Sequence, residues 1–283
     1  MSVINTNVKS LMAQNAMTIN NRSMSHAMQQ LSTGKRINSA ADDAAGLAMS
    51  ETMTAQIRGL DMAVRNANDA VSLLQTAEGA MIEQTNMLQR MRELAVQASS
   101  DTVSSIEKTY INTEYQQLMK EIDRIGANTE WNGDAILTGA GGLASSTSGL
   151  YTFQVGANAG SGQTITVTIN DMSTGSGGQY SGLASTSLTA ATASSLISTI
   201  DTAIDNIASQ RATIGAAINR LTYAADNLSN ISQNVSESRS RVLDTDYAKA
   251  SSELARTQII AQASTAMLAQ ANQQPQMVLK LLQ

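Results

Sequence analysis

The sequence predicts a mainly α protein: an elongated, antiparallel, coiled-coil-like helical bundle with a small β-hairpin, and with the two termini paired as an outer helical pair. Apolar residues recur at alternating spacings of three and four over long stretches, as in helices that pack side by side. Only 3% of the chain is aromatic, so Ala, Leu, Ile and 15 Met carry the apolar content, which suits closely packed helices. Pro275 is the one proline, so almost nothing interrupts a helix.

Weak helices are expected at the two ends, over residues 5–33 and 246–274. Each has an apolar stripe among many Asn, Gln, Ser or Ala residues, so neither should be stable alone. Asn5 is an expected N-cap of the first helix, and Asp244 or Asp246 of the second. The ends are expected to meet in space, because the helices between them should bundle antiparallel.

Three longer apolar seams predict strong helices between these ends. The strongest seam is broken only at Arg211 and Ser232 and comprises Ile197, Ile200, Ile204, Ile207, Ile214, Ile218, Leu221, Ala225, Leu228 and Val235. A second seam comprises Met53, Ile57, Leu60, Val64, Ala67, Val71, Leu74, Met81 and Leu88. A shorter one comprises Ile111, Tyr115, Leu118, Ile122 and Ile125.

Local signals bound these helices. Ser104 with Glu107 predicts a capping box at the start of the third seam, and Gly126 stands where a helix-ending glycine is expected. A helix from about residue 47 to 99 would be ~80 Å long at about 1.5 Å per residue, too long for a compact globule, so a rod is expected.

The middle of the chain predicts a β-hairpin. Residues 139–182 hold 11 of the 18 glycines and many Ser and Thr, so turns are expected there. Within this stretch, Thr164, Thr166 and Thr168 alternate with β-branched apolar residues, which is typical of a strand with one buried face.

The composition argues against several functional classes. The net charge of -5 includes no basic block, so nucleic-acid binding is not expected. No apolar run reaches the roughly 18 residues of a membrane span, so no membrane partner is expected. The chain has no Cys, which excludes disulfides and thiolate sites. Chance would explain this absence, and so would exposure to oxidising surroundings or passage of the chain through a pore.

No constellation for catalysis, cofactor binding or metal binding is found, and we expect no enzyme. His26 is the one histidine, and a helix-surface or packing role is expected for it. Asp42 and Asp43 lack the spacing of a calcium loop, so a polar joint and a helix N-terminal charge are expected instead.

Several long sequence segments, taken in order, resemble bacterial flagellin. They include SVINTNVKSLMAQN, LSTGKRINSAADDAAGLA, LQRMRELAVQASS, FQVGANAG, LDTDYAKASSELARTQI and QQPQMVLKLLQ, and the resemblance covers roughly residues 1–139, 151–170 and 190–283. It implies a structural subunit that self-assembles into the flagellar filament for motility, exported unfolded and polymerised at the tip. A hook–filament junction protein of the same family and a monomeric coiled-coil adaptor are the alternatives.

The resemblance also implies two domains. D0, formed by residues 1–38 and 240–283, would pair the terminal helices in the filament core. D1, at 39–239, would contain the hairpin at about 150–170 and a short Gly/Ser/Thr-rich tip at 139–190. About 20 residues separate the hairpin from the next helix, too few for the outer domains D2 and D3.

Two surfaces are predicted. The terminal apolar residues predict an assembly seam of Val3, Ile4, Val8, Leu11, Leu254, Leu268, Val278, Leu279, Leu281 and Leu282. The resemblance implies a possible contact with a vertebrate Toll-like receptor at Gln89, Arg90, Leu94 and Glu114. The implied partners are many copies of the chain itself, the flagellar export apparatus, an export chaperone and the filament cap. The implied location is extracellular.

Overall fold

The computed structural model describes residues 7–139, 149–175, 177–184, 188–189 and 192–281, without the side chains of Ser161 and of residues 274–281. It confirms the mainly α fold with a small antiparallel strand pair. The main helices are α1 (Val8–Thr33), α2 (Ala44–Ala98), α3 (Ser105–Asn128), α5 (Ala193–Leu243) and α6 (Tyr247–Leu281), with a short α4 (Ser181–Ala184). The strands are β1 (Glu130–Trp131), β2 (Asp134–Ala135), β3 (Leu150–Gln154) and β4 (Thr164–Thr168), with a 3₁₀ turn η1 (Ser161–Gln163) before β4. None of the described helices is both long and apolar enough to cross a membrane.

Contacts divide the chain into two units. Unit 1 comprises Met1–Ile57 with Gln233–Gln283, and unit 2 comprises Arg58–Ser232. The predicted domain boundary at 38/39 lies between α1 and α2 and that at 239/240 lies near the end of α5, whereas the contacts divide the chain within α2, after Ile57, and within α5, after Ser232. Within unit 1 these two helix ends interact, since the Arg239 Nη1 donates to the Thr54 hydroxyl over 3.4 Å. The division into D0 and D1 stays a prediction.

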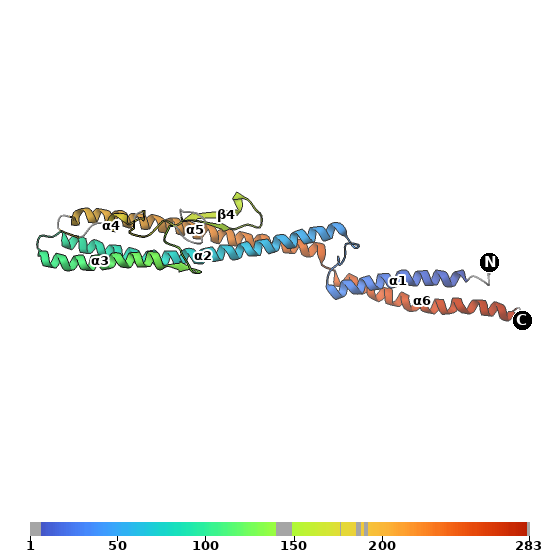
Figure 1. The fold of residues 1–283 in the computed structure, drawn as a ribbon. Helices are drawn as coiled ribbons and strands as arrows, with labels where there is room; N and C mark the ends of the chain where they lie inside the picture. Colours follow the sequence, from blue (N-terminus) through green and yellow to red (C-terminus); the bar gives the residue numbers. More distant parts are fainter. Residues whose placement is uncertain (1–6, 140–148, 176, 185–187, 190–191, 282–283) are drawn as a thin grey trace. The chain divides into compact units, whose positions relative to one another are not determined.

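In unit 1, α1 and α6 pack side by side and run antiparallel (Figure 1). The side chain of Asn7, rather than Asn5, caps α1 by accepting from the Ser10 N–H, and Asn5 lies outside the described residues. Asp246 rather than Asp244 caps α6, because its carboxylate accepts from the N–H of Ala248. Each cap satisfies a backbone donor that the first helical turn leaves free.

The segments that follow α1 and α5 pair with each other in unit 1. The Arg36 N–H donates to the Leu243 carbonyl over 2.7 Å, and the Thr245 N–H donates to the Gly34 carbonyl over 3.0 Å. Gly34 ends α1 with a φ of 69°, the left-handed conformation that glycine adopts without strain.

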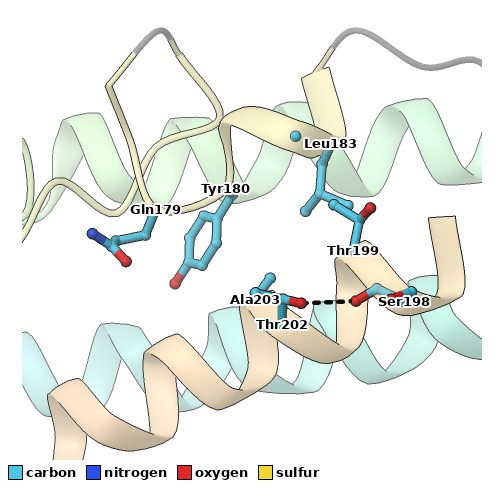
Figure 2. A pocket seen from close by; sticks show the side chains of 8 residues that line it. Gln179, Tyr180, Leu183, Ser198, Thr199, Thr202 and Ala203 are labelled. Carbon is cyan, nitrogen blue, oxygen red and sulfur yellow. Dashed lines mark hydrogen bonds between the residues drawn. The ribbon is translucent and has the colours of Figure 1, made fainter. Parts of the chain in front are cut away.

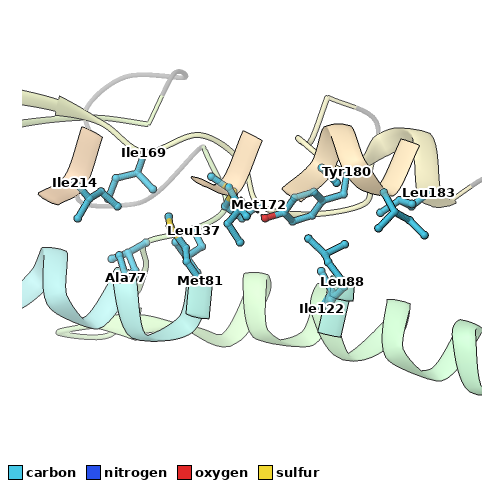
Figure 3. Close-up of a cluster of buried hydrophobic side chains, with 14 of the residues drawn as sticks. Ala77, Met81, Leu88, Ile122, Leu137, Ile169, Met172, Tyr180, Leu183 and Ile214 are labelled. Carbon is cyan, nitrogen blue, oxygen red and sulfur yellow. Dashed lines mark hydrogen bonds between the residues drawn. The ribbon is translucent and has the colours of Figure 1, made fainter. Parts of the chain in front are cut away.

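Unit 2 has one main apolar core, to which α2, α3, α5 and the hairpin contribute (Figure 3). It includes fully buried side chains such as Met81 and Leu88 of α2, Ile122 of α3 and Ile214 of α5. The hairpin covers this core as predicted: Ile165 and Val167 of β4 are buried, while Thr166 between them is exposed. Its strands are antiparallel, with Leu150 opposite Thr168.

The buried face of α5 differs in part from the predicted seam. Of the predicted positions, Ile200, Ile207, Ile214, Leu221, Ala225 and Leu228 are buried. Between them, Ala203 and Ala217 are buried, whereas their predicted neighbours Ile204 and Ile218 are partly buried at the edge of the core. Gln210 is also buried, because its side-chain amide donates to the Thr168 carbonyl at the end of β4 over 2.8 Å. The fully buried face of α5 therefore includes both large and small residues, and the two alanines permit closer approach than isoleucine would.

Of the two local signals predicted for α3, the capping box is confirmed and the helix-ending glycine is wrong. Ser104 and Glu107 form the predicted capping box. Gly126 does not end the helix, which continues to Asn128. It is buried, and a Cβ there would lie 2.8 Å from the Met172 carbonyl oxygen. Glycine is therefore required for the close approach of two backbone segments.

Candidate assembly surface

The face by which α1 and α6 pack together is made of small and polar side chains. Ser10, Asn20 and Ala27 of α1 are buried against α6, and Ala250 and Thr257 of α6 are buried against α1. Small residues let two helices approach closely, but they bury little apolar area. This pairing alone therefore contributes little hydrophobic stabilisation.

Hydrogen bonds set the register of the pair. The Asn20 side-chain amide donates to the Thr257 carbonyl over 2.8 Å, in a buried position. The Ser10 hydroxyl donates to the Asn272 side-chain oxygen over 3.0 Å nearer the end of the pair. A polar residue buried between two helices finds its hydrogen-bond partner in one register only, so it favours that register of the pair over shifted ones.

The large apolar side chains of the pair point outward. Val8, Leu11 and Ile19 of α1 and Ile259 of α6 are each more than half exposed. At about 100° per residue, a side chain two positions from a buried one lies on the opposite face of the helix. Val8 has this relation to Ser10, and Ile259 has it to Thr257. The fully buried side chains of the pair are thus small or polar, whereas several of its large apolar side chains are exposed.

The predicted seam residues fall into three groups. Val8 and Leu11 face outward, whereas Leu254 and Leu268 are half-buried on the face of α6 that packs on α1. The structure describes the backbone but not the side chains of Val278, Leu279 and Leu281 in α6. It does not describe Val3, Ile4 or Leu282. The predicted seam did not include Met12, Met267, Ile19 or Ile259, which are also exposed on α1 and α6. In α1 the sequence does contain a signal for this face. Leu11 and Met12 follow Val8 by three and four residues, and Ile19 follows Met12 by seven.

Comparison with known proteins identifies the family of the chain. The family model of the bacterial flagellin N-terminal helical region matches residues 4–141, and that of the bacterial flagellin C-terminal helical region matches residues 197–282. The flagellin of Halalkalibacterium halodurans is 46% identical over 281 residues, with 99% of both chains covered. The flagellin of Bacillus subtilis is 42% identical, with 99% of both chains covered. A crystal structure of Bacillus cereus flagellin aligns at 35% identity, covering 58% of this chain and 88% of that one, with a TM-score of 0.48.

The chain belongs to the bacterial flagellin family. Flagellins are structural proteins that build the extracellular filament used for motility, and this chain is a filament subunit.

The receptor-contact residues implied by the resemblance lie in unit 2 of this flagellin, and three of the four are exposed. Gln89 and Arg90 are exposed on α2, and the Arg90 Nε donates to Glu114 Oε1 on α3 over 2.9 Å. The Glu114 and Glu93 carboxylates raise the pKa of Arg90 above its usual value. Leu94 is only 1% exposed and belongs to the core, because the buried stripe of α2 includes it. A receptor contact at Leu94 would require this buried side chain to become accessible, and it stays a prediction.

The lone histidine of this flagellin contacts the joint after α1. The His26 Nε2 lies 3.1 Å from Asp42 Oδ1. The second Asp42 oxygen accepts from the N–H groups of Asn38 and Ser39, and these bonds lower the pKa of the Asp42 carboxyl below its usual value. Asp43 caps α2 by accepting from the Gly46 N–H. Within the described ranges, no group of three His, Asp or Glu residues could hold a metal ion.

A pocket of about 260 Å³ lies beside α4 and α5 of the flagellin (Figure 2). Tyr180 and Leu183 line it on one side, and Ser198, Thr199 and Thr202 line it from α5. Burial raises the pKa of the Tyr180 hydroxyl above its usual value. Hydroxyls of this kind can hold a small polar molecule, but the described lining offers no acid–base pair.

Proposed function

We propose that this flagellin polymerises through the outward faces of its α1/α6 pair, with copies of the same pair covering one another. The observation that carries the proposal is the reversal of polarity: Asn20 and Thr257 are inside the pair, while Leu11 and Ile259 are outside. The terminal residues Val3, Ile4, Val278, Leu279, Leu281 and Leu282 would extend the same apolar surface.

The energetics favour coverage by neighbours. Full burial of one large apolar side chain is worth roughly 1.5–3 kcal/mol, so several such residues on each subunit supply substantial association energy. A contact that joins two different faces of the same chain leaves one face free at one end of the polymer and the other face free at the opposite end. Such contacts propagate into a helical filament rather than closing into a small oligomer.

A paired substitution on α1 tests this proposal. Leu11→Ser with Ile19→Ser removes two outward apolar side chains, and we expect the monomer to keep its helix content by circular dichroism but to fail to elongate filament seeds. Leu11→Met with Ile19→Met keeps the surface apolar and should elongate seeds like wild type. Normal filaments from the serine variant would refute the proposed surface. Removal of residues 277–283 should block elongation in the same way.

We also infer that the chain is exported unfolded by the flagellar export apparatus, with an export chaperone, and is placed by the filament cap. The absence of Cys supports this inference, because a disulfide would hinder passage of an extended chain. The sparse apolar area within the α1/α6 pair supports it as well, since a weak pair is readily separated before export.

A second proposal concerns recognition by a vertebrate innate immune receptor at Gln89, Arg90 and Glu114. It is supported by their exposure and by the ion pair that joins α2 to α3. Arg90→Ala monomers should lose signalling in receptor-reporter cells. Arg124→Ala, which removes another exposed, paired arginine on α3, should signal like wild type. Equal signalling by both variants would refute the contact.

A further inference from the structure

Two methionines stand out on the proposed assembly surface. Met12 of α1 is 69% exposed and Met267 of α6 is 65% exposed. Along the pair, both lie between the Ser10–Asn272 and Asn20–Thr257 hydrogen bonds. In unit 2, by contrast, Met81 and Met91 are fully buried in the core.

The chemistry of the chain makes these two thioethers notable. The sequence contains no Cys, so no thiol within the chain competes with methionine for an oxidant. A thioether that is open to solvent reacts readily with peroxides, whereas one enclosed in a core is shielded. We propose that Met12 and Met267 form an oxidation site through which hydrogen peroxide blocks addition of the free subunit to a filament. This inference rests on the proposed assembly surface.

The reaction is a two-electron oxygen transfer. A lone pair on the methionine sulfur attacks one peroxide oxygen, an S–O bond forms, and the O–O bond breaks. The departing hydroxide takes up the proton of the transferred oxygen, so one sulfoxide and one water result. The sulfur is oxidised and the peroxide is reduced. The sulfoxide is polar, so burying it between subunits loses the favourable transfer of an apolar side chain from water.

The same geometry predicts protection after assembly. Met12 lies beside Leu11 on the outward face, so a neighbouring subunit that covers Leu11 also covers the Met12 sulfur. Peroxide should therefore oxidise these positions in free monomers and spare them in preformed filaments. The site would act on subunits before they are incorporated.

The test compares seed elongation by monomers with and without peroxide treatment. Peptide mass mapping should show one added oxygen at Met12 and Met267 before any at Met81 or Met91. The treated wild type should elongate seeds about tenfold or more slowly, since each buried sulfoxide loses on the order of one apolar side chain of association energy. Met12→Leu with Met267→Leu should elongate seeds at the same rate after peroxide treatment as before it.

Two controls sharpen the result. Met49→Leu with Met62→Leu removes two other exposed methionines and should remain as peroxide-sensitive as wild type. Methionine sulfoxide reductases A and B should restore elongation of the treated wild type, a readout that needs no substitution. Normal elongation by wild type carrying both sulfoxides would overturn the inference while leaving the filament function intact. Untreated wild type that cannot extend seeds would instead overturn the proposed assembly function.

Discussion

At the scale of single residues, the buried polar side chains of unit 2 are satisfied to different degrees. Gln84 is fully buried, and its amide donates to the carbonyls of Ile122 and Met172. Tyr115 is also fully buried, but among the described residues its hydroxyl has no hydrogen-bond partner, and burial raises its pKa to about 12. A buried polar group without a partner costs about 1–3 kcal/mol, so Tyr115 is a weak point of the core.

Tyr115→Phe should therefore raise the free energy of unfolding at pH 7 by about 1 kcal/mol. In wild type, the folded pKa of about 12 exceeds the unfolded value, which is about 10. The contribution of the neutral hydroxyl is thus complete below pH 10 and is lost as the pH rises from 10 to 12. From pH 10 to 12 the free energy of unfolding, measured with urea, should therefore fall less in the phenylalanine variant than in wild type. Tyr110→Phe, at an exposed position, serves as the control; a less stable Tyr115→Phe would contradict the prediction.

At the scale of elements, two helical glycines have opposite surroundings. Gly126 of α3 faces the Met172 carbonyl, whereas a Cβ at Gly79 of α2 would meet nothing within 4 Å. Glycine in a helix normally costs about 1 kcal/mol relative to alanine, so its retention at Gly126 has a packing reason. At Gly79 nothing in the structure requires glycine.

Gly79→Ala should stabilise the protein by up to about 1 kcal/mol, because alanine loses less backbone entropy in a helix. Gly126→Ala should instead destabilise it by about 1–3 kcal/mol, because the new methyl group forces two backbone segments apart. Thermal or urea unfolding of the two variants measures both effects. A stabilising Gly126→Ala would show that α3 and the segment at Met172 can separate without cost.

At the scale of the whole molecule, the two units differ in how they are stabilised. Unit 2 buries a large apolar core, while the α1/α6 pair of unit 1 buries mainly small and polar residues and leaves its large apolar ones exposed. Local stability follows buried apolar contacts, so the pair should open far more readily in the free subunit.

Amide hydrogen exchange of the monomer should show this difference. We expect fast exchange over residues 8–33 and 247–273 and slow exchange along the buried seam of α5 in unit 2. After polymerisation, exchange in α1 and α6 should slow strongly, because neighbours cover the outward faces. Equal protection of both units in the monomer would contradict the account of a weak terminal pair.

The sequence by itself determined the existence and type of the long helices and of the β3/β4 hairpin, but not of β1, β2, η1 or α4. Helical spacing predicted α2, α3 and α5, alternation predicted β3 and β4, and the Ser104–Glu107 capping box appeared as expected. These features depend on interactions between residues close in the chain. Their periodicity is therefore visible without knowing what packs against them.

Only the tertiary structure decided which part of each stripe faces which neighbour. It placed Ala203 rather than Ile204 at the centre of the core, buried Leu94, and gave Gly126 a packing role. It also turned Leu254 toward α1 while leaving Leu11 exposed. Periodicity gives the direction of an apolar stripe but not its partner. The neighbours that pack on a helix therefore decide which positions of its stripe are fully buried and which stay at the edge.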